Sequence, residues 1–285
     1  MTLSTTTDPL VDLDVDLLLL PLSADPAGPL VDLLADTFGA SLGRAADDLG
    51  DTAGDTVRLY PEAAAAERVA LVSMGAAEDL DAEALRRAGA GGASVAGATK
   101  AASVACMLPT VDLNDGLAAQ AVVEGFLLGA YQYRRYKTED GYAGADSFLL
   151  HGGEDHDRSA VQDGLDTAQA LSGGACTARD LVNTSPNDKT ARAFAETIQA
   201  SGAAHGYDVE TWDEERIREE GFGGLLAVNQ GSFEPPSFSI LTWNPDHAVN
   251  DRPVVLAGKG VVFDTGGLSL KDTKGSMDMM KADMA

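Results

Sequence analysis

Apolar stretches and helix-type patterns alternate along the first half of the chain. Residues 15–22 form an apolar run of strand length, and residues 30–42 repeat apolar positions at helical spacing. The alternation continues, with strands expected at 57–60, 68–74, 103–108 and 147–150 and helices at 81–97 and 115–131. Segments that alternate in this way are typical of an α/β domain. The pattern predicts an N-terminal α/β domain with a mixed sheet flanked by helices.

A stretch rich in glycine and charge, HGGEDHD at 151–157, interrupts this pattern. We therefore place the N-terminal domain at 1–155 and a second α/β domain at 156–285. Its expected elements are a long helix at 159–182, strands at 209–212, 225–228, 238–243 and 253–256, and a helix at 213–220. A last helix is predicted from Met277, and neither a cap nor a breaker follows it before Ala285. We expect the second domain to be incomplete at its C-terminal end.

The net charge of the chain limits the kinds of molecule that it can bind. The chain carries 45 acidic and 20 basic residues, a formal net charge of −25, and Asp outnumbers Glu by 31 to 14. Such a surface repels nucleic acid and anionic lipid, so neither is expected as a partner. With only seven lysines, the composition favours adaptation to high salt, and the alternative is an ordinary acidic protein. The two cysteines, the absence of a long apolar run and the absence of an early basic residue predict a cytoplasmic protein.

Candidate chemistry gathers in residues 258–285, which hold four of the seven lysines. Asp264 follows the apolar run 261–263 and precedes Thr-Gly-Gly, which places a carboxylate at a strand end beside a backbone that a ligand can approach. Lys259 lies between two glycines, and Asp283 falls on the helix that follows. Carboxylates that converge repel each other unless a cation lies between them, which indicates a hard divalent metal. The alternative is a glycine turn with solvated charges.

The same stretch, GKGVVFDTGGLSLKDTKGSMDMMKADM, resembles the metal-binding segment of the leucyl aminopeptidase (cytosol aminopeptidase) family. Three further segments resemble family segments in the same order: YQYRRYKTED at 131–140, ARDLVNTSPND at 178–188 and GFGGLLAVNQGSFEPPSF at 221–238. The likeness covers nearly the whole chain. It implies a metal-dependent aminopeptidase that releases N-terminal residues, Leu and Met by preference, from peptides with a free N-terminus.

Carried over residue by residue, the resemblance implies that Lys259, Asp264 and Asp283 bind two divalent ions, Mn²⁺ or Zn²⁺, with Asp264 bridging both. A lysine ligates a metal only as the neutral amine. Lys271 would be the catalytic lysine that stabilises the oxyanion of the peptide carbonyl. Met280 would line the pocket for the first side chain, since a methionine is an adaptable wall. The alternative is that Met280 is a helix-core residue.

The family continues into a segment N-T-D-A-E-G-R, with two more carboxylate ligands and an arginine that holds a bicarbonate base, and this segment does not occur within the 285 residues. We therefore expect these 285 residues to be the front part of the enzyme and to be inactive by themselves. The complete form is expected to be a homohexamer. One alternative is a catalytically silent fragment or assembly protein that keeps only the fold. Another is a nucleotide-binding N-terminal domain, although no phosphate-loop spacing supports it.

Two other features of the sequence receive a structural interpretation. His151, Glu154 and His156 lie in the HGGEDHD stretch, but their spacing differs from that of a zincin-type metal motif, so a solvated interdomain loop is expected. Cys106 lies within a predicted strand and is expected to be a small core residue, while Cys176 is expected to pack along the long helix.

Overall fold

The computed structural model describes residues 1–285 with the exception of 24–28, 62, 139–140, 245, 247, 268–269, 273–278, 281 and 283–285. The chain divides into two compact units, Met1–Thr177 (unit 1) and Ala178–Ala285 (unit 2). The division falls inside α5 (Arg158–Asn183), a helix of 26 residues. The domain boundary after residue 155 stays a prediction, and it lies just before the start of this helix.

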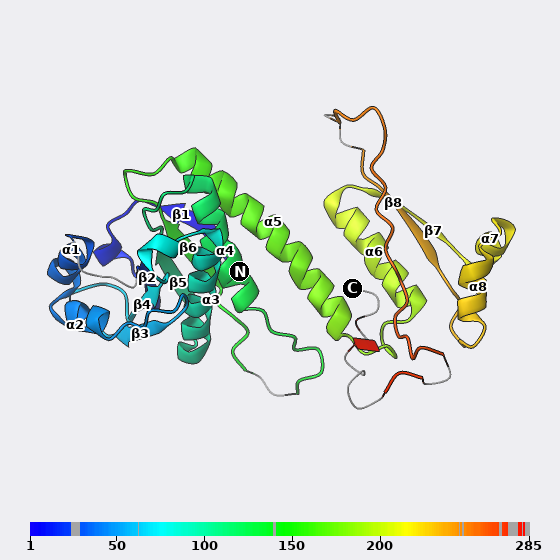
Figure 1. Cartoon of the computed structure of the whole chain (residues 1–285), viewed down its shortest axis with the longest axis horizontal. Helices are drawn as coiled ribbons and strands as arrows, with labels where there is room; N and C mark the ends of the chain where they lie inside the picture. The colour runs from blue at the N-terminus through cyan, green and yellow to red at the C-terminus, as the bar shows by residue number, and fades with distance from the viewer. Residues whose placement is uncertain are drawn as a thin grey trace. The chain divides into compact units, whose positions relative to one another are not determined.

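Unit 1 contains one six-stranded sheet with the strand order β1-β6-β5-β2-β4-β3 (Figure 1). All neighbouring strands are parallel except β3, which runs antiparallel to β4 at the edge. The strands are β1 (Thr2–Thr6), β2 (Leu17–Leu22), β3 (Thr56–Leu59), β4 (Val69–Ser73), β5 (Ser103–Met107) and β6 (Ser147–His151). The predicted α/β domain with a mixed sheet is therefore confirmed.

Helices cover both faces of this sheet, which explains why all the leucines of β2 are buried. Leu17 and Leu19 pack in the core cluster formed with α3 and α4, whereas Leu18 and Leu20 pack in the cluster formed with α1 and α2. Successive side chains of a strand point to opposite faces, so a central strand with two covered faces is apolar throughout. The helices are α1 (Pro29–Phe38), α2 (Ser41–Asp47), α3 (Ala82–Thr99) and α4 (Asp115–Gly129), with short 3₁₀ turns at Leu10–Asp12 and Ala77–Asp79.

Capping side chains and glycines explain most of the boundaries of these helices. The Asp81 carboxylate caps α3 by accepting a hydrogen bond from the Ala84 backbone N–H, and the Asn114 side chain caps α4 in the same way. The single helix expected at 30–42 is wrong, because Gly39 takes a φ of +99° and separates α1 from α2. The sequence interpretation missed β1, whose residues TLSTT lack an apolar alternation and which lies at the sheet edge beside β6.

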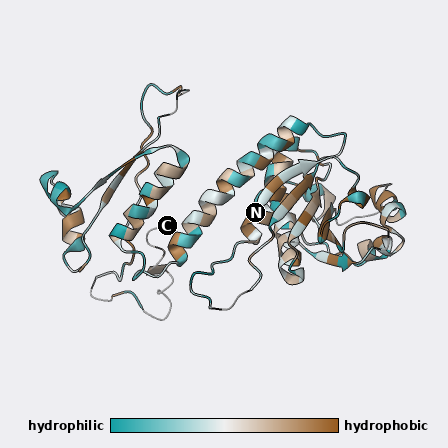
Figure 2. Ribbon diagram, turned by 180° about the vertical axis from the view of Figure 1, so that it is seen from behind, coloured by the Kyte–Doolittle hydropathy of each residue, from teal (hydrophilic) through white to brown (hydrophobic). Residues whose placement is uncertain are grey.

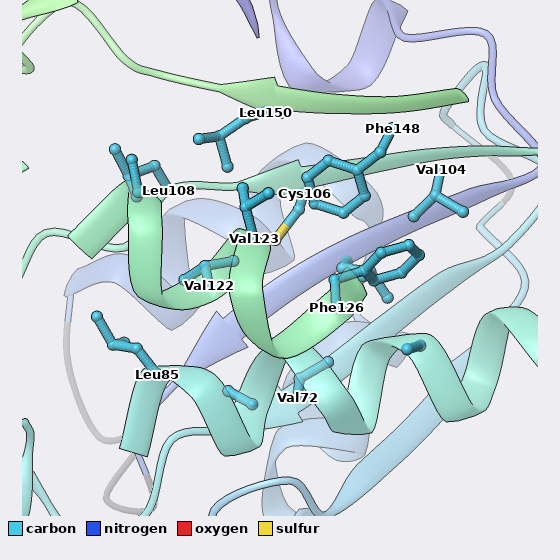
Figure 3. Close-up of a cluster of buried hydrophobic side chains, with 14 of the residues drawn as sticks. Val72, Leu85, Val104, Cys106, Leu108, Val122, Val123, Phe126, Phe148 and Leu150 are labelled. Atoms are coloured by element: carbon cyan, nitrogen blue, oxygen red, sulfur yellow. The ribbon is translucent and has the colours of Figure 1, made fainter. Parts of the chain in front are cut away.

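The cluster under α3 and α4 is closely packed around two aromatic rings. The ring centroids of Phe126 and Phe148 lie 4.5 Å apart, and both side chains are fully buried (Figure 3). Glycines allow the two helices to approach, since a Cβ atom on Gly89 or Gly125 would clash with backbone atoms of the facing helix. The predicted core role of Cys106 agrees with its burial, which raises the pKa of its thiol to about 12.

Unit 2 has fewer elements and a two-stranded sheet. Its elements are α6 (Ala191–His205), β7 (Asp208–Trp212), α7 (Glu214–Glu219), α8 (Gly223–Asn229) and β8 (Phe238–Thr242), and β7 pairs with β8 in antiparallel register. The Trp212 ring lies 5.5 Å from that of Phe222 and 5.2 Å from that of Phe238, between ring centroids. This aromatic cluster holds α7 and α8 to the sheet.

Two strand predictions for unit 2 are wrong, and one helix was missed. Residues 225–228 lie in the helix α8 rather than in a strand, because a run of four apolar residues has no length or period that separates the two. Residues 253–256 are not part of a strand ladder. Helix α6 was not predicted, although Thr190 caps it with its side-chain oxygen. Of the helix expected from Met277, residues 279 and 280 are helical and most of the remainder lies outside the described residues.

Hydropathy along the ribbon differs between the units (Figure 2). Unit 1 has two large clusters of buried apolar side chains, whereas the described part of unit 2 buries only Ala195, Ile217 and Met280 among its apolar residues. Among the helices that the structure describes, none combines the length and the apolar character needed to cross a membrane.

Candidate functional site

The predicted site residues meet in a loop of unit 2. Asp264 lies after the extended segment 256–263, and the chain then turns back on itself. The Asp264 carboxylate accepts a hydrogen bond of 2.7 Å from the Gly266 backbone N–H, and the Lys271 backbone N–H donates one of 3.0 Å to the Thr265 carbonyl. These two bonds fold the loop so that Lys271 returns to the carboxylate that precedes it by seven residues.

Glycine is required in this turn for two reasons. Gly266 and Gly267 have φ values of +77° and +81°, which side chains with a Cβ atom rarely adopt. A Cβ atom on Gly266 would also lie 3.0 Å from Cγ of Lys271, closer than ordinary van der Waals contact. The glycine pair therefore makes room for the lysine beside Asp264.

Two ammonium groups approach one carboxylate in this loop. Nζ of Lys271 lies 3.3 Å and Nζ of Lys259 lies 3.7 Å from Oδ2 of Asp264. The side chains of Lys271, Asp264 and Lys259 keep 31%, 36% and 52% of their exposure, so the cluster is open to a ligand rather than enclosed. The structure thus brings together three of the five predicted site residues, and in this state they form ion pairs.

The side chains of this loop supply some of the ligands that a metal ion needs. A carboxylate oxygen is a ligand that hard divalent ions prefer, and the Lys259 amine, once neutral, adds a nitrogen donor at the same point. No three His, Cys, Asp or Glu side chains gather into a metal-binding group within the described ranges, so further ligands are needed. The predicted ligand Asp283 lies outside the described residues. The metal-binding roles of Lys259, Asp264 and Asp283 stay predictions.

Met280, the predicted pocket residue, has only 4% of its surface exposed. This burial agrees with either of the two interpretations, a pocket wall or a core residue. Its role also stays a prediction.

A groove next to the cluster was not predicted. It has a volume of about 780 Å³ and is lined by residues of α6, α8 and β8 and by the segment 256–263, to which Lys259 contributes. Its apolar walls come from Phe194 and Ile198 of α6 and from Leu225 and Val228 of α8. No sequence signal identifies it, because its lining comes from segments far apart in the chain.

Lys189 was also missed. It has 2% of its surface exposed, and its ammonium donates a hydrogen bond of 2.6 Å to the carbonyl of Leu181 near the C-terminal end of α5. A cation near helix C-terminal carbonyls is favourable, so this lysine fastens the turn that leads into α6. The only available signal was its position after the helix in a chain with seven lysines.

The histidines of the connection between β6 and α5 are less solvated than expected. Nδ1 of His151 and Nδ1 of His156 are both inaccessible to solvent and have no hydrogen-bond partner among the described residues. Burial lowers the pKa of His151, with a smaller contribution from the neighbouring His156. The expected solvated loop is therefore wrong at these two ring nitrogens.

The six-stranded mixed sheet and the Lys-Asp-Lys loop define a class, a two-unit α/β protein with a candidate reaction centre in its second unit. Two profiles of one family match the chain: "Cytosol aminopeptidase family, N-terminal domain" over residues 38–140 and "Cytosol aminopeptidase family, catalytic domain" over residues 176–285. The chain belongs to the cytosol aminopeptidase family.

Known proteins agree with this assignment. A probable cytosol aminopeptidase of Chloroherpeton thalassium is 35% identical over 100% of this chain and 59% of its own length, and one of Streptomyces coelicolor is 34% identical over 100% and 58%. The bottromycin maturation enzyme BotP in complex with Mn has a TM-score of 0.75 at 30% identity, over 94% of this chain and 53% of BotP. A mutant of tomato leucine aminopeptidase has a TM-score of 0.83 at 22% identity, over 100% and 56%, and shows the fold alone. The chain thus spans 53–59% of the length of these proteins.

Proposed function

We propose that this protein is a metal-dependent, cytoplasmic aminopeptidase that acts on peptides with a free N-terminus, and that unit 2 carries its reaction centre. Its membership of the cytosol aminopeptidase family supports the reaction class. The observation that carries the proposal is the position of Asp264 within ion-pair distance of both Lys259 and Lys271. These contacts support the proposal, because they bring one carboxylate and two amines to the same point.

Lys259, Asp264 and Asp283 would hold two divalent ions. The chemistry that such ions supply is a water molecule of lowered pKa that serves as the nucleophile. A structure of BotP contains Mn, which makes Mn²⁺ the first ion to test. Asp264 is oriented for this task by its hydrogen bond to the Gly266 N–H, which fixes one oxygen and leaves Oδ2 toward the amines.

Lys271 would act on the substrate itself. Its ammonium lies 3.3 Å from the carboxylate of Asp264. It would donate a hydrogen bond to the peptide carbonyl oxygen as negative charge develops there. The buried Met280 would face the first side chain of the peptide, and a flexible thioether suits Leu and Met. A bicarbonate base and assembly into a homohexamer are further proposals for a form with a complete catalytic domain.

The test uses a fusion protein, which we define as residues 1–285 followed by the part of the Chloroherpeton thalassium relative beyond its matched region. We expect Mn²⁺- or Zn²⁺-dependent release of leucine from leucine amide and no release from its N-acetylated form, because the free amine anchors the substrate. Equal turnover of the blocked substrate would exclude an aminopeptidase.

A second candidate is that residues 1–285 alone are catalytically silent. Among the proposed ligands only Asp264 and Asp283 are carboxylates, and two divalent ions carry about four positive charges that two carboxylates do not offset. We expect no measurable activity when this chain is saturated with Mn²⁺ at high salt and assayed on leucine amide. Activity within about tenfold of the fusion protein would show that these residues suffice.

A further inference from the structure

At one edge of the unit 1 sheet, the ends of β1 and β6 meet the first residues of α4 and α5. The Gly152 backbone N–H donates a hydrogen bond of 3.0 Å to the Thr6 carbonyl and so ties the end of β6 to the end of β1. The Asp157 backbone N–H donates one of 2.8 Å to the Asp115 carboxylate at the start of α4. We call residues 152–157, which lead from β6 into α5, the β6–α5 connection. Hydrogen bonds fasten this connection at both of its ends.

Two imidazoles belong to this part of the chain, His151 at the end of β6 and His156 within the connection. Nδ1 of each ring is closed to solvent and has no hydrogen-bond partner among the described residues. In a neutral imidazole this nitrogen can carry a lone pair alone, whereas in an imidazolium it carries an N–H. A buried N–H without an acceptor is costly. The closed connection therefore accommodates a neutral ring at His151 and disfavours an imidazolium there.

The charges that face His151 come from the segments packed around it. Burial is the largest cause of the lowered pKa of His151, and a charge on His156 lowers it further. Asp8, which follows β1, acts in the opposite direction and offsets the lowering only in part. The other side chains of the adjoining segments are uncharged, engaged or exposed: Met107 of β5 lies opposite His151, Asp115 of α4 and Asp157 accept backbone hydrogen bonds, Arg158 of α5 donates one to Thr7, and Glu154 and Asp155 are exposed.

A proton is the ligand that these rings are placed to take. Histidine nitrogens also bind metal ions, but in the described part of the chain no third His, Cys, Asp or Glu joins the two rings in a metal-binding group. Uptake of a proton needs only one ring nitrogen and no cavity. Because an unperturbed imidazole titrates near pH 6.5, such a proton binds or leaves within the physiological range. The pair is therefore a candidate pH sensor rather than a candidate metal site.

Strand β1 is the element that an opening of this connection releases most easily. It lies at the edge of the sheet, pairs with β6 alone among the described strands, and buries none of its five side chains (Figure 1). By contrast, all six residues of β2 and all five of β4 are buried. Segments with few buried contacts open at a lower free energy than core strands do. Loss of the closed connection therefore affects β1 before it affects the inner strands.

We infer that His151 operates a pH-sensitive latch in unit 1, in which the β6–α5 connection is the part that opens and His156 is the neighbouring ring that adjusts it. At neutral pH His151 is neutral and the connection is closed. When His151 takes up a proton from water, its new N–H gains an acceptor by exposure to solvent, and the connection opens. The opening releases β1 and the first turn of α5, while β2, β4 and β5 stay paired. The inference concerns unit 1 and is independent of the proposed activity.

Amide hydrogen exchange of the 285-residue chain at pH 7.5 and 5.5 tests the inference. The rates are corrected for the pH dependence of chemical exchange, which leaves the opening equilibrium of each segment. Between these pH values, an imidazole of pKa about 6.5 that titrates only in the open form shifts this equilibrium at most about tenfold. We expect amides in 2–6 and 159–162 to lose protection severalfold, up to that limit, and amides in 17–22 and 69–73 to keep theirs. Unchanged protection of β1, or an equal loss in β2 and β4, would overturn the inference.

Three variants assign the effect to a ring. His151→Asn removes the titrating imidazole and should abolish the loss of protection in 2–6. His156→Asn removes the ring that disfavours a proton on His151 and should reduce the loss. His205→Asn changes an exposed histidine of unit 2 and is the control, in which the loss should stay as in the parent chain. The full loss in His151→Asn contradicts the latch.

A titration of the parent chain decides the question if a variant does not fold. The ring protons of the four histidines are assigned by NMR in an isotope-labelled chain and followed from pH 8 to pH 5. The opening equilibrium of β1, measured at the same pH values, should change in step with the protonation of His151. A change in step with another histidine, or with none of the four, overturns the inference.

Discussion

Units 1 and 2 have similar building blocks but differ in how far their apolar surfaces are covered. In unit 1 the apolar side chains of β2 are divided between two helix layers and are all buried. In unit 2 the segment 256–263 and the helices α6 and α8 line an open groove, and the described residues bury few apolar side chains. The described part of unit 2 therefore covers its apolar surface less completely than unit 1 does.

The ionic contacts of the two units differ in the same way as their apolar surfaces. An ionic contact of unit 1, between Nε of Arg86 and Oε2 of the buried Glu124 at 2.6 Å, joins α3 to α4 and is supported by Gln120. The ionic contacts of the Asp264 loop are partly exposed, and no regular element carries them. Charges in a partly exposed loop beside a groove are accessible to a ligand, whereas charges between packed helices stabilise the fold.

The largest expected effect is on the core of unit 1. Phe126→Ala should lower the free energy of unfolding by about 3–5 kcal/mol, because the ring is fully buried against Phe148 and leaves a cavity. Phe222→Ala in the aromatic cluster of unit 2 is the matched variant and should cost less, since that ring is partly exposed. Urea unfolding followed by far-ultraviolet circular dichroism measures both. Equal losses would contradict the contrast between the two cores.

Substitutions in unit 2 should affect catalysis more than substitutions in unit 1 do. Lys271→Ala in the fusion protein should lower kcat about 10²–10³-fold, or roughly 2.7–4 kcal/mol, with metal content unchanged, because it removes one donor to the oxyanion. Asp264→Ala should remove metal and activity together. The control is Lys137→Ala, the loss of an exposed lysine in unit 1, which should change neither. Steady-state kinetics with metal analysis separates the variants, and metal loss in Lys271→Ala would contradict the assigned role.

The two units also differ in how well the sequence predicts them. Helices α3 and α4 and strands β2, β4 and β5 follow from apolar period and capping residues such as Asp81, because both faces of the sheet are covered by nearby chain. In unit 2 the strands predicted at 209–212 and 238–243 match β7 and β8, but 225–228 is helical and 253–256 has no strand partner among the described residues. A strand needs a neighbour to form, and whether one is present cannot be read from the segment itself.

The sequence also predicts some parts of the candidate site and not others. The motif placed Lys259, Asp264 and Lys271 in one loop, and the Thr-Gly-Gly turn explains physically why they meet. The groove could not be predicted, because its walls combine α6, α8 and β8 with 256–263, and α6 itself was missed. Lys189 has no motif that identifies its contact with Leu181, since a helix-end contact depends on the path of the following turn.

A smaller effect compares equivalent helix caps in the two units. Asp81→Ala removes the cap of α3 in unit 1, and Thr190→Ala removes the cap of α6 in unit 2, each at a cost of about 0.5–2 kcal/mol. Both tryptophans, Trp212 and Trp243, lie in unit 2, so their fluorescence reports on that unit alone. Thr190→Ala should therefore shift the fluorescence midpoint in urea, and Asp81→Ala should leave it in place. A shift of the fluorescence midpoint in Asp81→Ala would mean that the units unfold as one.

The smallest effect is a pH dependence confined to unit 1. Burial lowers the pKa of His151, and His156 lowers it further, while Asp8, which follows the neighbouring β1, opposes the shift. The folded unit therefore binds a proton on this imidazole less readily than the unfolded chain, whose histidine pKa is about 6.5. Protonation favours unfolding, so unit 1 should lose stability as the pH falls from about 6.5 through the lower pKa of folded His151. The Asp16 carboxylate, whose pKa is lowered by hydrogen bonds from the Ser103 and Ala102 backbone, should add a separate loss only below its ordinary value of 3.8.

His151→Asn should remove the loss in the upper window and leave the acidic one. Its control, His205→Asn, changes an exposed histidine of unit 2 and should keep the pH dependence of unit 1. Urea unfolding of unit 1, followed by circular dichroism at pH 7.5 and 5.5, compares the parent with both variants. The same fall in stability in His151→Asn as in the parent would show that another group titrates there. A fall in the tryptophan signal alone would place that group in unit 2.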